Sequence, residues 1–263
     1  MTVRAAIPRA AELPQTSRGE APAVAGPQHA AILAQLRELD AADWTRPTDC
    51  MSWTVHDIAA HVTGAMDSGA HLRVLLRHVR AAKRAGLAGT VDGLNAAQIA
   101  DRRDYPPARI LADLERLAPK AVRARRRAPS VLRRRAVPGD DLPAGSTFGY
   151  LFDVIYSRDV WMHRIDIARA TDRQVAACTS DGAVVEQVVR DLGRFWDGPP
   201  VLLDLTGPAG GSWLLGAGEP CAEVRTDAVE YLRLLSGRAA APQLHLSGQQ
   251  AARAALLAAR VAF

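Results

Sequence analysis

The sequence predicts an α+β protein in which a four-helix bundle is followed by a small α+β domain. The chain has 263 residues and is 48% hydrophobic, which is long enough to bury a sizeable core. Most of it reads as segments with apolar residues three and four positions apart, the period of an amphipathic helix. After "WDGPP" at 196–200 the pattern changes to short apolar runs separated by Gly and Pro, which is typical of strands.

The first 28 residues are rich in Ala, Pro and polar side chains and predict a disordered leader over 1–28. They lack the continuous apolar stretch of a secretory signal, and no segment approaches the ~18 to 20 apolar residues that span a bilayer. We therefore expect a cytoplasmic protein with no membrane partner.

Residues 29–197 form the predicted helical region. Thr54 is a good N-cap, and Asp57 three residues later completes a capping box. The helix that starts there runs to about Arg84 and is expected to break or relax near Gly64 and Gly69. Helices are predicted over 29–40, 54–84, 94–105, from 108 into the basic stretch, 150–171 and 181–195. These lengths and short connections suit a four-helix bundle.

Residues 198–263 form the predicted small α+β domain. Its apolar runs predict strands at 201–207, 211–216, 221–226 and 242–248. Helices are expected over 227–238, where Gly237 caps the end, and over 249–262.

The net charge is +5, and much of the excess lies in Lys120–Arg135, which carries eight basic residues and no acidic one. Such a stretch can contact nucleic acid or an anionic small molecule, or simply form a solvated helix face. No aromatic residue is interleaved with these charges and no recognition helix is evident, so the sequence argues against a nucleic-acid partner.

The cysteines Cys50, Cys178 and Cys221 are odd in number and widely spaced, with no Cys-x-x-Cys pair. Reduced, inert thiols are expected from this pattern. No Gly-rich nucleotide loop and no Gly-x-Ser-x-Gly elbow is present.

A candidate metal site is carried by the helix at 150–171. Asp159 and His163 are four residues apart and so share one helix face, with Asp166 three residues further on. His61, on another long helix, interrupts an apolar face and can supply a third ligand. Two imidazole nitrogens and one carboxylate leave a fourth zinc position open, which is typical of catalytic sites. Spacing alone also fits a surface ion pair, or a core histidine bonded to its partner.

The residues around these positions resemble a known family. They are Trp44, Pro47–Thr48, Trp53–Thr54–Val55, Asp57–Ile58, Ala60–His61–Val62, Arg158–Asp159, Trp161, His163 and Asp166–Ile167–Ala168. The pattern resembles the DinB-like metal-binding bundle and, more narrowly, the actinobacterial family of mycothiol-dependent maleylpyruvate isomerase. The C-terminal "DLTGPAGGSWLLG" and "PCAEVRTDAVEYLRLLSGR" resemble that family's small sterol-carrier-like domain. The resemblance covers roughly residues 29–250.

The resemblance implies a zinc ion held by His61, Asp159 and His163. The sequence departs from the family at Asp159, where the isomerase has Glu, one methylene longer. Asp166 is expected to orient an imidazole, or else to pair with Arg169 or Arg173. Arg238 resembles a family arginine important for activity that can clamp a substrate carboxylate; it can also simply favour its own helix dipole.

The activity implied is thiol chemistry. Mycothiol, held as a zinc-bound thiolate, would attack an electrophilic small-molecule substrate, giving isomerisation or S-transfer. The assembly expected is a monomer or homodimer. The alternatives are a non-catalytic small-molecule binding module with a structural His/Asp cluster and, least favoured, a regulatory protein that binds nucleic acid through its Arg-rich segment.

Overall fold

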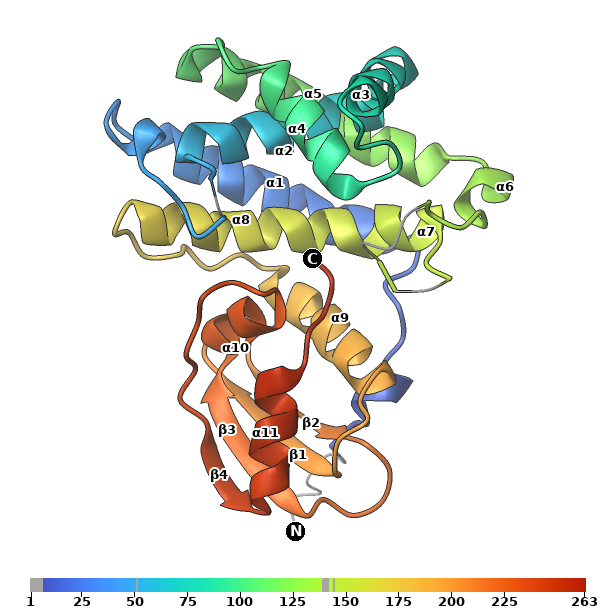
Figure 1. The fold of residues 1–263 in the computed structure, drawn as a ribbon, viewed down its shortest axis with the longest axis vertical. Coiled ribbons are helices and arrows are strands. Elements are labelled where there is room, and N and C mark those ends of the chain that lie inside the picture. Colours follow the sequence, from blue (N-terminus) through green and yellow to red (C-terminus); the bar gives the residue numbers. More distant parts are fainter. Residues whose placement is uncertain (1–6, 51, 139–141, 144) are drawn as a thin grey trace. The chain divides into compact units, whose positions relative to one another are not determined.

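The computed structural model describes residues 7–50, 52–138, 142–143 and 145–263, which form two compact units (Figure 1). One unit is Ser17–Ser180. The other combines residues 7–16 with Asp181–Phe263. The described chain therefore begins in the second unit, passes through the whole of the Ser17–Ser180 unit, and then re-enters the second unit at Asp181.

The Ser17–Ser180 unit is built on four long helices: α1 (Ala21–Arg37), α2 (Val55–Ala70), α5 (Pro107–Arg127) and α8 (Tyr156–Ala170). Helices α5 and α8 each pack against both α1 and α2, so the four close into a ring, as the sequence predicts. Their inward faces form one core, which includes Ile32, Leu36, Val55, Ile58, Met66, Ile110, Leu114, Leu117, Val160 and Ile167.

Short elements complete this unit. They are η2 (Asp43–Thr45), α3 (Leu72–Arg84), α4 (Val91–Ala100), α6 (Ser130–Arg133), α7 (Phe148–Tyr150) and a π-helical turn, η3 (Leu151–Ile155), that leads into α8. The predicted capping box is confirmed: the Thr54 side chain accepts from the Asp57 amide, and the Asp57 carboxylate accepts from the Thr54 amide. The predicted long helix breaks at His71, which has extended backbone angles, whereas Gly64 stays helical.

The prediction of a disordered leader is wrong for residues 7–28. Helix α1 already begins at Ala21, with Pro22 in its first turn, where a missing N–H is tolerated. Further upstream, the carbonyls of Leu13 and Pro14 accept hydrogen bonds from Arg190 and Gln187. A Pro-rich composition suggested disorder, but a proline lacks only the backbone N–H donor, and its carbonyl can still accept a hydrogen bond within a folded segment. Residues 1–6 of the predicted leader lie outside the described residues.

The second unit contains a four-stranded sheet of β1 (Val201–Thr206), β2 (Gly211–Leu215), β3 (Ala222–Asp227) and β4 (His245–Gly248), in the order β2-β1-β3-β4. The central pair β1 and β3 is parallel, and both outer pairs are antiparallel. Helices α10 (Ala228–Leu235) and α11 (Gln250–Ala258) follow β3 and β4. The predicted strands and the α+β class are confirmed.

The boundary between the units differs from the predicted one at 197/198. Helix α9 (Asp181–Arg194), expected in the helical region, packs instead with β2, α10 and the 3₁₀ turn η1 (Ala10–Glu12). At Gly193 an added Cβ would lie 2.5 Å from the Cβ of Ala10, so glycine permits this close approach. An amphipathic pattern shows that a helix buries a face, but not which partner covers it.

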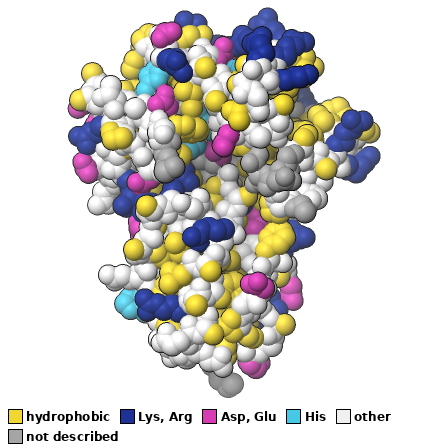
Figure 2. Space-filling model, in the orientation of Figure 1, with side chains coloured by type: hydrophobic (Ala, Val, Ile, Leu, Met, Phe, Trp, Pro, Cys, Tyr) yellow, Lys and Arg dark blue, Asp and Glu magenta, His cyan; other side chains and the backbone are white. Residues whose placement is uncertain are grey.

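Basic side chains are spread over several helices. In Figure 2 they gather over the end of the molecule that carries α3, whose exposed residues include Arg73, Arg80 and Lys83. The predicted basic stretch is not one solvated face, because Arg125 and Arg133 within it are buried. Among the described residues, no helix is long and apolar enough to cross a membrane.

Candidate metal centre

Helices α2 and α8 bring His61, Asp159 and His163 together, as the sequence predicts. The two carboxylate oxygens of Asp159 are shared between the rings: Oδ2 lies 3.3 Å from His61 Nε2, and Oδ1 lies 3.2 Å from His163 Nε2. Both rings are buried, whereas the Asp159 side chain is 23% exposed. Of the three side chains, that of Asp159 is therefore the most exposed to solvent.

The opposite nitrogen of each ring is fixed by an oxygen acceptor. His61 Nδ1 lies 2.8 Å from Gln98 Oε1 on α4, and His163 Nδ1 lies 3.0 Å from Oδ2 of the fully buried Asp166. These acceptors place a proton on each Nδ1, so both Nε2 lone pairs face the Asp159 carboxylate. Two lone pairs repel each other, so a proton or a cation must lie between each Nε2 and the Asp159 oxygen for the contact to be favourable.

Without a metal ion, a proton on His163 Nε2 takes that place beside Asp159 Oδ1. Burial opposes charge on both groups, but the attraction between Asp159 and His163 outweighs it. The pKa of Asp159 is held well below its usual range by His163 and His61, and the pKa of His163 is raised well above its usual range by Asp159 and by hydrogen bonds. The cluster is thus strongly polarised, which is the signature of many functional sites.

The geometry also fits a metal ion. Zinc–nitrogen and zinc–oxygen bonds of about 2.0 to 2.1 Å in a tetrahedron place neighbouring ligand atoms about 3.3 Å apart. The two N–O separations here are 3.3 and 3.2 Å, each to a different oxygen of Asp159, and one ligand atom from each of the three residues lies within 4.8 Å of the others. Each imidazole has the oxygen-held Nδ1 typical of metal-binding histidines. The shorter carboxylate of Asp159 reaches both rings, so the missing methylene does not remove the cluster.

Trp53 covers the two imidazoles. Its ring centroid lies 5.2 Å from that of His61 and 5.9 Å from that of His163. An apolar cover lowers the local dielectric and strengthens the charge interactions beneath it. Trp53, itself half-buried, thereby shields part of both rings from water.

A second polar layer lies one helical turn away. The Arg125 guanidinium on α5 donates to the Ala65 carbonyl, one turn after His61, and stacks 3.6 Å over the Tyr156 ring, one turn before Asp159. Arg125 is buried, and burial lowers the pKa of its guanidinium. A positive charge is therefore held next to the cluster within the bundle.

The sequence of the bundle matches a family model. Residues 25–168, more than half of the chain, match the model described as "Mycothiol maleylpyruvate isomerase N-terminal domain". The matched range includes His61, Asp159 and His163. The chain belongs to this family.

Two solved structures share the fold of this chain. They are crystal structures of the mycothiol-dependent maleylpyruvate isomerase and of a histidine-to-alanine mutant of it, 16% and 17% identical to this chain. Each comparison has a TM-score of 0.55 and covers 92% of this chain and 96% of the other. No curated protein sequence matches the chain significantly.

Arg238 lies outside the range that matches the mycothiol maleylpyruvate isomerase family model. It follows α10 in the second unit, where it is half-buried and its Nη1 lies 3.1 Å from Ser236 Oγ. Its predicted role in catalysis therefore stays a prediction.

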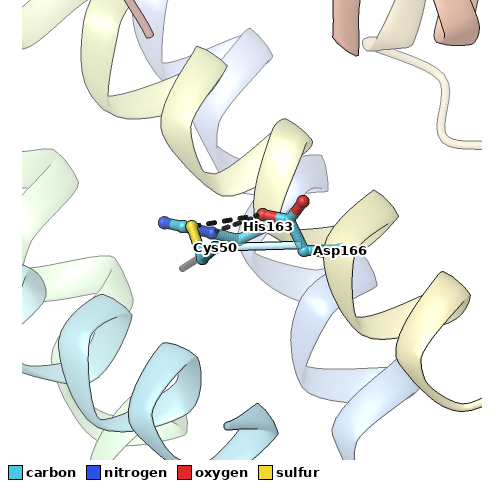
Figure 3. A group of neighbouring side chains, drawn as sticks. All are labelled: Cys50, His163 and Asp166. Atoms are coloured by element: carbon cyan, nitrogen blue, oxygen red, sulfur yellow. Dashed lines mark hydrogen bonds and ion pairs between the residues drawn. The ribbon is translucent and has the colours of Figure 1, made fainter. Parts of the chain in front are cut away.

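Two residues that lie at the candidate metal centre, Gln98 and Cys50, were missed by the sequence analysis. Gln98, the acceptor for His61, has no signal in the sequence, because only the packing of α4 on α2 places it. Cys50 Sγ lies 3.8 Å from Asp166 Oδ2 and beside His163 (Figure 3), a contact that the sequence analysis did not anticipate; that its thiol is inert stays a prediction. Its position just before the His61 helix was the available signal. Asp166 orients His163 rather than forming only a surface pair.

Proposed function

We propose that the protein is a metal-dependent enzyme that uses mycothiol to isomerise an electrophilic small-molecule acid such as maleylpyruvate. The observation that carries this proposal is the convergence of His61, Asp159 and His163 with both Nε2 atoms directed at one carboxylate. Membership of the mycothiol maleylpyruvate isomerase family is the reason for proposing mycothiol as the thiol and isomerisation as the reaction class.

His61, Asp159 and His163 would hold the metal, which we take to be zinc. When bound there, the ion would favour the reactive thiolate form of a thiol beside it. Gln98 and Asp166 keep the Nδ1 proton on each ring, so that both Nε2 lone pairs stay directed at the ion. The partly exposed Asp159 faces the side from which thiol and substrate enter.

The residues also explain how a reversible addition is favoured. Trp53 lies close to both imidazoles, and by limiting water around them it would favour reaction of the thiolate with the substrate over its protonation. Addition of sulfur to the conjugated double bond makes it a single bond that rotates, and loss of the same sulfur restores the double bond in the trans form. If the sulfur stays, the outcome is S-transfer.

The test is thiol-dependent isomerisation of maleylpyruvate by the zinc-supplied protein, beside a His61→Ala variant. We expect the variant to lose activity and about one zinc per chain, since three protein ligands are needed. The control is His71→Ala, a half-buried histidine on Asp67 that lies outside the cluster and should leave both unchanged. Unchanged zinc content in His61→Ala contradicts the proposed site.

The products distinguish the remaining functions. A stable thiol conjugate in place of the trans isomer identifies an S-transferase. Thiol or acid binding without turnover, with no zinc bound, identifies the non-catalytic binding module instead.

We also propose that Arg238 binds the substrate carboxylate, as the family resemblance implies. Arg238→Gln should raise KM for the acid while zinc content and the binding of the thiol stay the same, because a bidentate ion pair is lost. Arg253→Gln, at an exposed position on α11, is the matched control. An unchanged KM in Arg238→Gln rejects this role.

A further inference from the structure

A second group of metal-ligand side chains lies beside the first. Cys50, His163 and Asp166 place their ligand atoms within 4.8 Å of one another. In Figure 3, dashed lines join the Asp166 carboxylate to the Cys50 sulfur and to the His163 ring. Cys50 comes from the loop that precedes α2, and Asp166 comes from the α8 turn after His163.

The separations match those of a tetrahedral zinc site. Cys50 Sγ lies 3.8 Å from Asp166 Oδ2, and His163 Nδ1 lies 3.0 Å from the same oxygen. With zinc–sulfur bonds of about 2.3 Å and zinc–nitrogen or zinc–oxygen bonds of about 2.0 Å, the tetrahedral distances are about 3.5 and 3.3 Å. These two separations differ from the tetrahedral values by about 0.3 Å, and the ligand atoms of all three residues lie within 4.8 Å of one another.

The ligand chemistry selects the kind of cation. A sulfur, an imidazole nitrogen and a carboxylate oxygen favour zinc and related thiophilic ions over magnesium or calcium, which prefer oxygen alone. Cys50 is half-buried, so an ion can reach it from solvent. Two deeply buried partners, His163 and Asp166, would hold the ion on its inner side.

His163 takes part in both groups through different atoms. Its Nε2 is directed at Asp159, and its Nδ1 is directed at Asp166. Ions in the two positions would therefore not compete for a ligand atom. One imidazole ring would connect them.

We propose that Cys50, His163 and Asp166 form a second binding site for a thiophilic divalent cation, linked to the first through the His163 ring. Binding displaces the Cys50 S–H proton and the His163 Nδ1 proton, which leave to solvent. In that state the ion would take the place of the Nδ1 proton that Asp166 otherwise accepts from the ring. The second site needs neither His61 nor Asp159, so it stands or falls separately from the proposed function.

Cobalt titration of the metal-free full-length protein tests the site. We expect about two equivalents of Co²⁺ to bind, with a sulfur-to-cobalt charge-transfer band in the near ultraviolet. Cys50→Ser should abolish the band and remove about one equivalent. Cys178→Ser and Cys221→Ser, at two other half-buried thiols, are matched controls. Each should keep the charge-transfer band and about two equivalents of bound cobalt.

The His61→Ala variant separates the two proposals. If the second site exists, this variant keeps the sulfur band even if the isomerase activity is never found. Cobalt binding without a sulfur band, or a band that survives Cys50→Ser, overturns the second site.

Alkylation of the unmodified protein provides a measurement that does not depend on a folded variant. Zinc should protect Cys50 from iodoacetamide, as read by peptide mass spectrometry, while labelling of Cys178 and Cys221 is unchanged. Equal labelling of Cys50 with and without zinc overturns the proposal.

Discussion

His29 shows at the scale of one residue how the bundle interior tolerates a polar ring. Its side chain is buried on α1, and neither ring nitrogen has a hydrogen-bond partner among the described residues. Burial, together with the nearby Arg125 charge, lowers the pKa of His29 to about 3. The ring is therefore neutral in the folded protein at any ordinary pH.

This neutrality predicts a pH dependence. In the unfolded chain His29 takes up a proton below pH ~6.5, so the unfolded state binds more protons and the free energy of unfolding falls as the pH drops from about 6.5 towards 3. The loss due to this group is about 1.4 kcal/mol per pH unit. Urea unfolding of the full chain at two pH values in this window should show that His29→Leu removes this part of the dependence. His245→Leu, at an exposed position, should leave the pH dependence unchanged. The same change of unfolding free energy with pH in the unmodified protein and in both variants would refute the assignment to His29.

Gln98 carries a second prediction at this scale. Gln98→Leu removes the acceptor of the His61 Nδ1 proton, and loss of such a partner lowers metal affinity by about 10- to 100-fold. Competition with a chromogenic zinc chelator measures this. Gln98→Glu keeps an acceptor and should retain most of the affinity. Gln187→Leu, which loses hydrogen bonds to Pro14 and Thr16 in the other unit, should have no effect.

At the scale of elements, the approach of α4 to α2 positions Gln98. Gly64 lies one turn after His61, and a Cβ added there would stand 2.6 Å from the Cβ of Gln98. Glycine is therefore required for the contact between these helices, although it lowers helix propensity. The sequence suggested a break at Gly64, but the residue serves helix packing instead.

Gly64→Ala is expected to lower the free energy of unfolding by about 1 to 3 kcal/mol, the usual cost of overpacking, and to weaken zinc binding because Gln98 is pushed away. Gly182→Ala, in the first turn of α9, meets no atom within 4 Å and should be neutral or stabilising by up to about 1 kcal/mol. Thermal and urea unfolding give both values. A stabilised Gly64→Ala variant would disprove the close contact.

Local signals fixed many elements in advance and left others open. The Thr54–Asp57 capping box and the apolar runs of β1 to β3 depend on neighbours in sequence, so they were predictable. His61, Asp159 and His163 were found because helical spacing and the family resemblance agree. Gln98 and Cys50 were missed because their roles depend on contacts between segments 37 and 116 residues apart in sequence.

At the scale of the whole molecule, every described residue of both metal groups lies within Ser17–Ser180. We expect a fragment of these residues to fold alone, with helical circular dichroism and the zinc affinity of the full chain. The range 29–197, drawn from the sequence, removes the first two turns of α1 and adds α9 without its partners. This second fragment should aggregate or melt at a lower temperature. Equal behaviour of the two fragments would contradict the division into units.

The path of the chain between the units has a consequence for synthesis. Arg9 donates a hydrogen bond to the carbonyl of Gly216, a residue 207 positions later. On a ribosome that adds about 5 to 20 residues per second, this N-terminal segment waits about 10 to 40 seconds for its partner. The helical bundle can form during that interval. The sheet unit is completed only after translation has passed β4 (His245–Gly248), so the two units are expected to fold in order, with the metal groups assembled first.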